Sequence, residues 1–82
     1  MNIYVGNLSY RLQEKDLQGI FAEYGEVTSV KIITDKFTRR SKGFGFVEMT
    51  DDNAAQKAIG ELDGAEVEGR NIKVNQARQR EE

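Results

Sequence analysis

The sequence contains no cysteine, histidine, tryptophan or proline among its 82 residues. Without cysteine and histidine, a disulfide framework, a zinc finger and a histidine-based catalytic triad are excluded. No run of apolar residues exceeds three, which excludes a membrane-spanning helix and a secretory signal, so we expect a cytoplasmic protein. A chain of this length buries only roughly 60% of its unfolded surface. We therefore expect one domain without a deep active-site cleft.

The apolar pattern predicts six elements in the order β-α-β-β-α-β. The predicted strands span residues 2–5, 27–34, 42–49 and 70–77. The first predicted helix spans residues 14–24 with Gly25 as its stop, and the second begins at a cap on Thr50 or Asp51 and ends near Gly60 or Gly64. Two crossovers of this size favour a ferredoxin-like α+β sandwich, in which both helices cover one face of a four-stranded antiparallel sheet.

The other face of this sheet has no predicted cover. Aliphatic residues must face the helices, and alternation along each strand turns their neighbours outward. Gly43 and Gly45 face inward, where the lack of a side chain lets the helices approach the sheet. The expected outward residues are Asn2, Tyr4, Lys31, Ile33, Lys42, Phe44, Phe46, Glu48, Lys73, Asn75 and Ala77.

Three aromatic rings with basic neighbours on an open sheet suit unpaired nucleic-acid bases. Each base presents a π face and each phosphate a negative charge. Stacking contributes about 1–3 kcal/mol per base, and phosphate contacts add a salt-dependent contribution. A lone aromatic residue at such a position is more often ordinary packing, but three converging rings favour a binding surface.

Two of the predicted strands resemble the sequence motifs of the RNA recognition motif family. Residues 42–49, Lys-Gly-Phe-Gly-Phe-Val-Glu-Met, fit seven of the eight positions of its RNP1 motif. Residues 3–8, Ile-Tyr-Val-Gly-Asn-Leu, are similar to its RNP2 hexamer. The chain most resembles small single-domain bacterial RNA-binding proteins, which are similar to the RNA-binding half of glycine-rich RNA-binding proteins. The expected domain spans residues 1–78, followed by a charged, frayed tail over residues 79–82.

The resemblance implies single-stranded RNA lying across the sheet, with bases on Tyr4 and Phe44 and with Phe46 against ribose or between nucleotides. Lys42 would contact phosphate, and the fourth strand and its exit would read base edges. Single-stranded DNA is a further expected ligand, because stacking and phosphate contact need no 2′-OH. We expect a monomer without metal or cofactor. The expected RNA-binding residues are Asn2, Tyr4, Lys31, Arg40, Lys42, Phe44, Phe46, Lys73, Asn75, Ala77 and Arg78.

The chain departs from the family pattern at two places. Met49 replaces the final aromatic residue of RNP1, but alternation places it in the core, so the binding face is unchanged. Phe37 and Arg39 lie in the loop before the third strand, where many relatives carry an acidic residue and a glycine. These two residues make the loop more basic than it is in those relatives.

Two other functions fit the same architecture. Small phosphatases of this fold cradle an anion in the loop after the first strand. Here that loop, residues 7–12, holds Arg11 but no glycine-rich nest, so we expect no enzyme. A protein-binding module remains the alternative, although intact aromatic residues favour nucleic acid. Asp51 and Asp52 are interpreted as helix caps because no further oxygen ligands follow at coordinating spacing.

The formal net charge of −2 is divided unevenly along the chain. Residues 31–42 carry +4 and residues 69–82 carry +2, whereas residues 50–68 carry −5. The positive segments border the predicted open face, and most of the acid falls on the helices. The net acidity therefore predicts a polarised domain and does not exclude nucleic acid.

Overall fold

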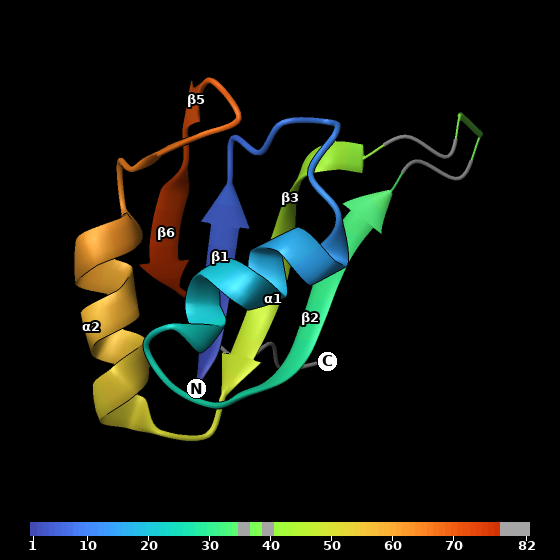
Figure 1. The fold of residues 1–82 in the computed structure, drawn as a ribbon. Helices are drawn as coiled ribbons and strands as arrows, with labels where there is room; N and C mark the ends of the chain where they lie inside the picture. The colour runs from blue at the N-terminus through green and yellow to red at the C-terminus, as the bar shows by residue number, and fades with distance from the viewer. Residues whose placement is uncertain (35–36, 39–40, 78–82) are drawn as a thin grey trace.

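The computed structural model describes residues 1–34, 37–38 and 41–77. The predicted elements appear in the predicted order (Figure 1). A short hairpin, β4 (Glu66–Val67) and β5 (Arg70–Asn71), lies between the second helix and the last strand. The remaining elements are β1 (Asn2–Gly6), α1 (Glu14–Ala22), β2 (Val27–Thr34), β3 (Ser41–Met49), α2 (Asp52–Leu62) and β6 (Lys73–Gln76).

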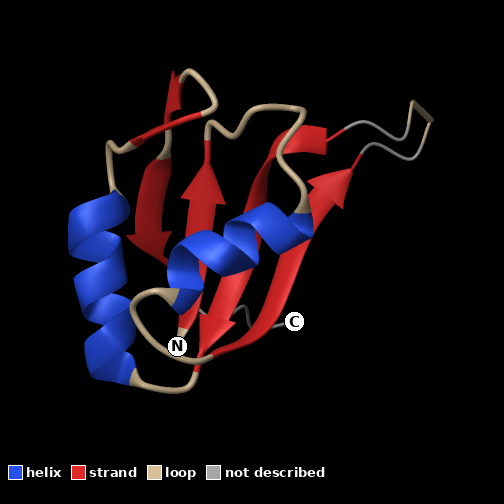
Figure 2. Cartoon of the chain, viewed as in Figure 1, coloured by secondary structure: helices blue, strands red, loops and turns tan. Residues whose placement is uncertain are grey.

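Four strands form one sheet in the order β2-β3-β1-β6, and each neighbouring pair is antiparallel. Both helices lie on the same side of this sheet, as Figures 1 and 2 show. No helix in the described part of the chain covers the opposite side. The predicted ferredoxin-like sandwich with an open face is confirmed.

The hydrophobic core lies between the sheet and the two helices. Ile3 and Val5 of β1 are fully buried opposite Val47 and Gly45 of β3. Met49 is also fully buried, as its place in the alternation predicts. The buried apolar residues of the described chain are Ile3, Val5, Leu8, Leu12, Leu17, Phe21, Ile32, Val47, Met49, Ala55, Ala58, Leu62, Ile72 and Val74.

Side chains and backbone cap both helices. The Asp51 carboxylate accepts hydrogen bonds from the N–H groups of Asn53 (2.8 Å) and Ala54 (3.3 Å), which confirms Asp51 as the N-cap of α2. After α2, Gly64 has a φ of +87°, a left-handed conformation typical of a helix stop. At α1, the Gln13 N–H donates to Asp16 Oδ2 at 3.0 Å.

Two glycines have roles other than those predicted. Gly25 is not in the left-handed region that a helix stop of this kind uses. Instead, a Cβ there would lie 2.6 Å from Ala54 Cβ, so glycine lets the α1–β2 turn approach α2. At Gly45, a Cβ would collide with the Lys31 carbonyl oxygen of β2. Gly45 therefore permits close pairing of β3 with β2. The expectation that it permits close approach of a helix was wrong.

The predicted strand over residues 70–77 is divided at Ile72. Its N–H donates to the Ala65 carbonyl (2.9 Å), and its carbonyl accepts from the Gly64 N–H (2.8 Å), so Ile72 pairs with the segment after α2. Glu68 and Gly69 both have positive φ, 52° and 79°, which is the geometry of a two-residue hairpin turn. The chain thus forms a small hairpin before it joins the main sheet.

Within residues 1–34, 37–38 and 41–77, both helices are too short and too polar to cross a membrane.

Candidate nucleic-acid interface

The strand register arranges the open face, the side of the four-stranded sheet without helices, in rows. Directly paired residues on neighbouring strands project to the same side of a sheet. The central row is Lys31, Phe46, Tyr4 and Asn75, one residue from each of β2, β3, β1 and β6. We call the end of the sheet where the β1–α1 loop begins the loop end. The row toward the loop end holds Phe44, Gly6 and Lys73, and the row on the other side of the central row holds Ser29, Glu48 and Asn2.

The three aromatic rings meet on this face. The ring centres of Tyr4 and Phe44 lie 6.1 Å apart with an angle of 32° between the ring planes. Phe46 lies 5.9 Å from Tyr4 and 6.3 Å from Phe44, edge-on to both rings at 63° and 89°. Tyr4 and Phe44 are half-buried, and Phe46 is 39% exposed. The rings of Tyr4 and Phe44 are therefore tilted toward one another, while the ring of Phe46 stands across them.

Gly6 leaves room for the Tyr4 ring because it has no side chain. A Cβ at Gly6 would lie 2.5 Å from the Tyr4 hydroxyl oxygen and 2.9 Å from Cε2 and Cζ of the ring. The ring therefore lies along β1, over the Gly6 backbone, which it buries. The predicted first strand ended at residue 5, and Gly6 was included only in the hexamer of residues 3–8, although its spacing of two residues from Tyr4 placed both on the same face.

The polar residues predicted on this face are placed as follows. Asn2, Lys31, Lys73 and Asn75 are exposed on the open face. Lys42 lies in β3, and its side chain falls outside the described part of the structure. Arg40, Arg78 and Arg39 lie outside the described residues. Phe37, also noted in the sequence, is 96% exposed.

The backbone N–H of Ala77 is used within the sheet. It donates to the Asn2 carbonyl oxygen at 2.8 Å and so extends the pairing of β6 with β1. This N–H is therefore not available to a base. Any reading of a base by the backbone at Ala77 falls on its carbonyl oxygen.

Glu48 places an acidic group on the open face. It is exposed, and its Cα pairs with Asn2 on β1 and with Ser29 on β2. Its carboxylate makes no ion pair within the described residues. The alternation placed Glu48 outward, but it was not included among the expected binding residues.

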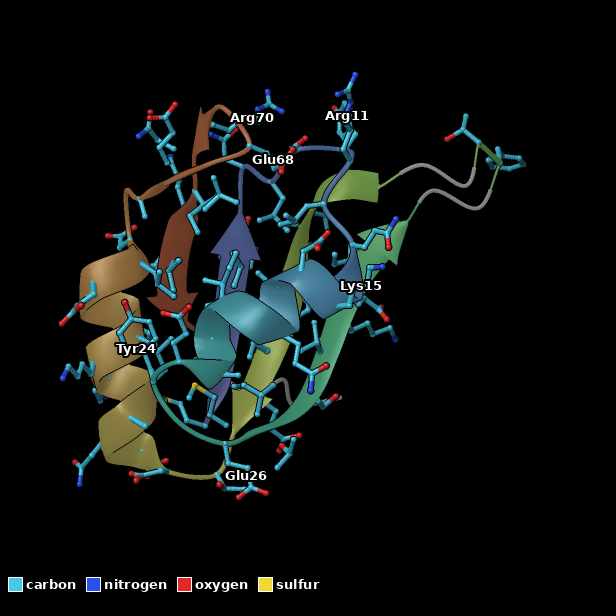
Figure 3. The ribbon with its side chains drawn as sticks, in the orientation of Figure 1. Arg11, Lys15, Tyr24, Glu26, Glu68 and Arg70 are labelled. Atoms are coloured by element: carbon cyan, nitrogen blue, oxygen red, sulfur yellow. The ribbon has the colours of Figure 1, made fainter. Side chains whose placement is uncertain are left out.

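On the helix side of the sheet, a tyrosine hydroxyl contacts a carboxylate. The Tyr24 hydroxyl donates to Glu61 Oε1 of α2 at 3.3 Å (Figure 3). Partial burial, together with the charge of Glu61, its hydrogen bond and the charge of Glu23, raises the pKa of Tyr24 above its ordinary 10.0. Across the described residues, no three acidic side chains cluster as a metal site.

Comparison with known proteins matches this chain to one family along most of its length. Residues 3–73 match the family model described as RNA recognition motif. The protein RbpD of Nostoc sp. is 56% identical over 82 residues, which are 100% of this chain and 87% of that protein.

Two solved structures have the same fold. The crystal structure of RNA Binding Protein PG1 has a TM-score of 0.94 and 56% identity, and the match covers 100% of this chain and 99% of the other. A complex of the Sxl-lethal protein with RNA has a TM-score of 0.91 and 31% identity, and the match covers 99% of this chain and 48% of the other.

Proposed function

This chain belongs to the RNA recognition motif family, and on that premise we propose that it binds single-stranded RNA on the open face of its sheet. The observation that carries the proposal is the meeting of Tyr4, Phe44 and Phe46 on that face, with ring centres 5.9 to 6.3 Å apart. In a soluble domain, three rings gathered beside exposed lysines are suited to stacking with bases.

The ring geometry supports a division of roles. Tyr4 and Phe44, inclined by 32°, take two successive bases. Phe46 stands edge-on to both and packs against ribose or between the nucleotides. This arrangement corresponds to about two to four nucleotides across the sheet.

The polar groups around the rings position the strand and read it. Lys31 and Lys73 contact phosphates from opposite edges of the sheet, since β2 and β6 are the outer strands. The amides of Asn2 and Asn75 read base edges, and the Ala77 carbonyl contributes an acceptor. The family resemblance adds Lys42 as a partner of phosphate and Arg78 as a reader of base edges, and Arg40 in the basic loop before β3 is a further partner of phosphate.

The remaining parts of the proposal concern the whole protein. Residues 1–78 form the binding domain, which acts as a cytoplasmic monomer without a cofactor and without catalysis. Single-stranded DNA binds as well, because stacking and phosphate contact need no 2′-OH. Light scattering of the free protein tests the monomer, and a DNA oligomer of the same sequence tests the DNA ligand.

Titration of labelled mixed-sequence RNA tests the binding surface. Phe44→Leu keeps an apolar side chain but removes the ring, so we expect affinity to fall about 5- to 150-fold, the equivalent of about 1–3 kcal/mol. Phe44→Tyr keeps a stacking ring and should retain most of the affinity. Equal affinity of Phe44→Leu and the wild type would contradict the stacking proposal.

A protein-binding module is the second candidate. The same exposed aromatic surface favours it, since exposed apolar patches also mark protein interfaces. Its signature would be no RNA binding at low salt, together with quenching of tyrosine fluorescence by a peptide.

A further inference from the structure

An aromatic residue and a basic residue, Tyr10 and Arg70, lie close together at the loop end of the sheet, outside the open face. Tyr10, in the loop between β1 and α1, is 64% exposed. The guanidinium carbon of Arg70, in β5, lies 5.9 Å from the centre of the Tyr10 ring. This distance is within the range of a cation–π contact. Because the ring stays largely exposed beside Arg70, the contact does not cover both of its faces.

The two loops that carry this pair are attached to the sheet. The Leu8 N–H donates to the Gly43 carbonyl at 2.8 Å, which fixes the Tyr10 loop to β3. Asn7 Nδ2 donates to the Asn71 carbonyl at 2.8 Å, which fixes the hairpin of Arg70 to the end of β1. Both side chains therefore extend from anchored backbone, and little ordering of that backbone remains for a ligand to impose.

The pair lies at the same end of the sheet as the last row of the open face. Phe44, Gly6 and Lys73 form the last row of the sheet at the loop end. A Cβ at Gly43, the residue before Phe44, would lie 3.7 Å from Cε1 of Tyr10. The Tyr10 ring thus lies next to the strand position that precedes the stacking residue Phe44. A nucleic-acid strand that leaves Phe44 toward this end of the sheet would pass near Tyr10.

The charge at this end also suits a phosphate chain. Arg11 and Arg70 lie there together with Glu68, as Figure 3 shows, and all three are exposed. The same hairpin also carries Glu66, so the charges balance and the two guanidinium groups act as local partners for phosphate. Guanidinium groups pair well with phosphate and also stack on aromatic rings and bases.

We propose that Tyr10 and Arg70 form a further nucleotide subsite for the same RNA strand. A base stacks on the exposed face of Tyr10, and Arg70 binds the adjoining phosphate. The proposal rests on RNA binding by the open face and extends the footprint beyond the nucleotides that the sheet holds.

Two oligomer lengths test this subsite. A mixed-sequence RNA of about four nucleotides fills the sheet, and one of about eight also reaches the loop end. We expect Tyr10→Leu to weaken binding of the longer RNA about five- to thirtyfold and to change binding of the shorter one less than about twofold. Arg70→Gln should also weaken binding of the longer RNA selectively, whereas Lys57→Gln on α2 should weaken binding of neither RNA.

Two further measurements separate a binding role from a structural one. Tyr10→Phe keeps the ring and should restore the affinity for the longer RNA. In the wild type, the Tyr10 ring protons should shift in the NMR spectrum when the longer RNA is added but not the shorter. An equal loss for both lengths, or no loss for either, overturns the subsite. A short RNA that binds the wild type and Phe44→Leu equally would instead overturn the sheet site on which it rests.

Discussion

Gly6 shows how a single residue without a side chain shapes the binding surface. The Tyr4 ring occupies the space where a Gly6 methyl group would lie, 2.5 Å from the hydroxyl oxygen. The ring can therefore lie along the strand, over Gly6 and toward Phe44, instead of projecting perpendicular to the sheet. The direction of a ring over its strand depends on rotamers and neighbours, and the sequence alternation cannot supply that information.

Gly6→Ala should displace the Tyr4 ring and weaken RNA binding by part of the about 1–3 kcal/mol that one stacked base contributes. Fluorescence titration of the variant measures this loss. The matched control is a double-mutant cycle with Tyr4→Leu, because Gly6→Ala should have no further effect once the ring is gone. Equal losses in both backgrounds would show that Gly6 acts independently of Tyr4.

Glu48 opposes the phosphates that the rest of the open face attracts. Because its carboxylate is exposed beside Asn2 and Ser29, we expect Glu48→Gln to raise RNA affinity by about two- to fivefold, within the range of about 1 kcal/mol for exposed charges. The gain should shrink as salt is added. Glu23→Gln, at the end of α1, is the control and should leave affinity unchanged. A loss of affinity in Glu48→Gln would show that the carboxylate accepts hydrogen bonds from bases.

At the scale of elements, the sequence predicted both helices, the first three strands and most of the outward positions that form the three rows of the open face. These features follow from local alternation and from the 3.6-residue period, which a sequence displays directly. The β4–β5 hairpin was missed because the alternation runs unbroken through Ile72 and Val74. The division at Ile72 arises from backbone bonds with Gly64 and Ala65, which leave no trace in the pattern of apolar residues.

The contact between Tyr24 and Glu61 links the end of α1 to α2 and depends on pH. Since the pKa of Tyr24 is raised above 10.0 in the folded protein, the folded state holds the phenol proton more tightly than the unfolded chain does. This stabilisation is fully present below pH 10 and is lost as pH rises through the raised pKa. Thermal unfolding should therefore show a steeper loss of Tm above pH 10 in the wild type than in Tyr24→Phe. Tyr10→Phe, which removes an exposed hydroxyl, should behave as the wild type does.

At the scale of the whole molecule, charge is separated between the two sides of the sheet. The acidic segment of residues 50–68, with net charge −5, contains α2 and β4, while Lys31 and Lys73 stand on the open face. A weakly anionic body with basic positions at its sheet disfavours indiscriminate attraction of phosphates.

Salt dependence measures how many phosphates the protein neutralises. On a single strand, each neutralised phosphate contributes about −0.7 to the slope of the logarithm of the binding constant against the logarithm of salt concentration. We expect Lys31→Gln and Lys73→Gln each to reduce the magnitude of this slope by about 0.7. Lys57→Gln, on α2, should leave it unchanged. If neither open-face variant alters the slope, Lys31 and Lys73 do not contact phosphates.

The position of β1 in the interior of the sheet has a consequence for synthesis of the protein. β1 is made before both of its neighbours, β3 and β6, which come from later segments of the chain. While the chain is being translated, Tyr4 has no partner ring until β3 has emerged, and one edge of β1 stays unpaired until Gln76 has left the ribosome. The domain therefore acquires its complete binding surface only after β6 has emerged, and until then it exposes a strand edge that can pair with other chains.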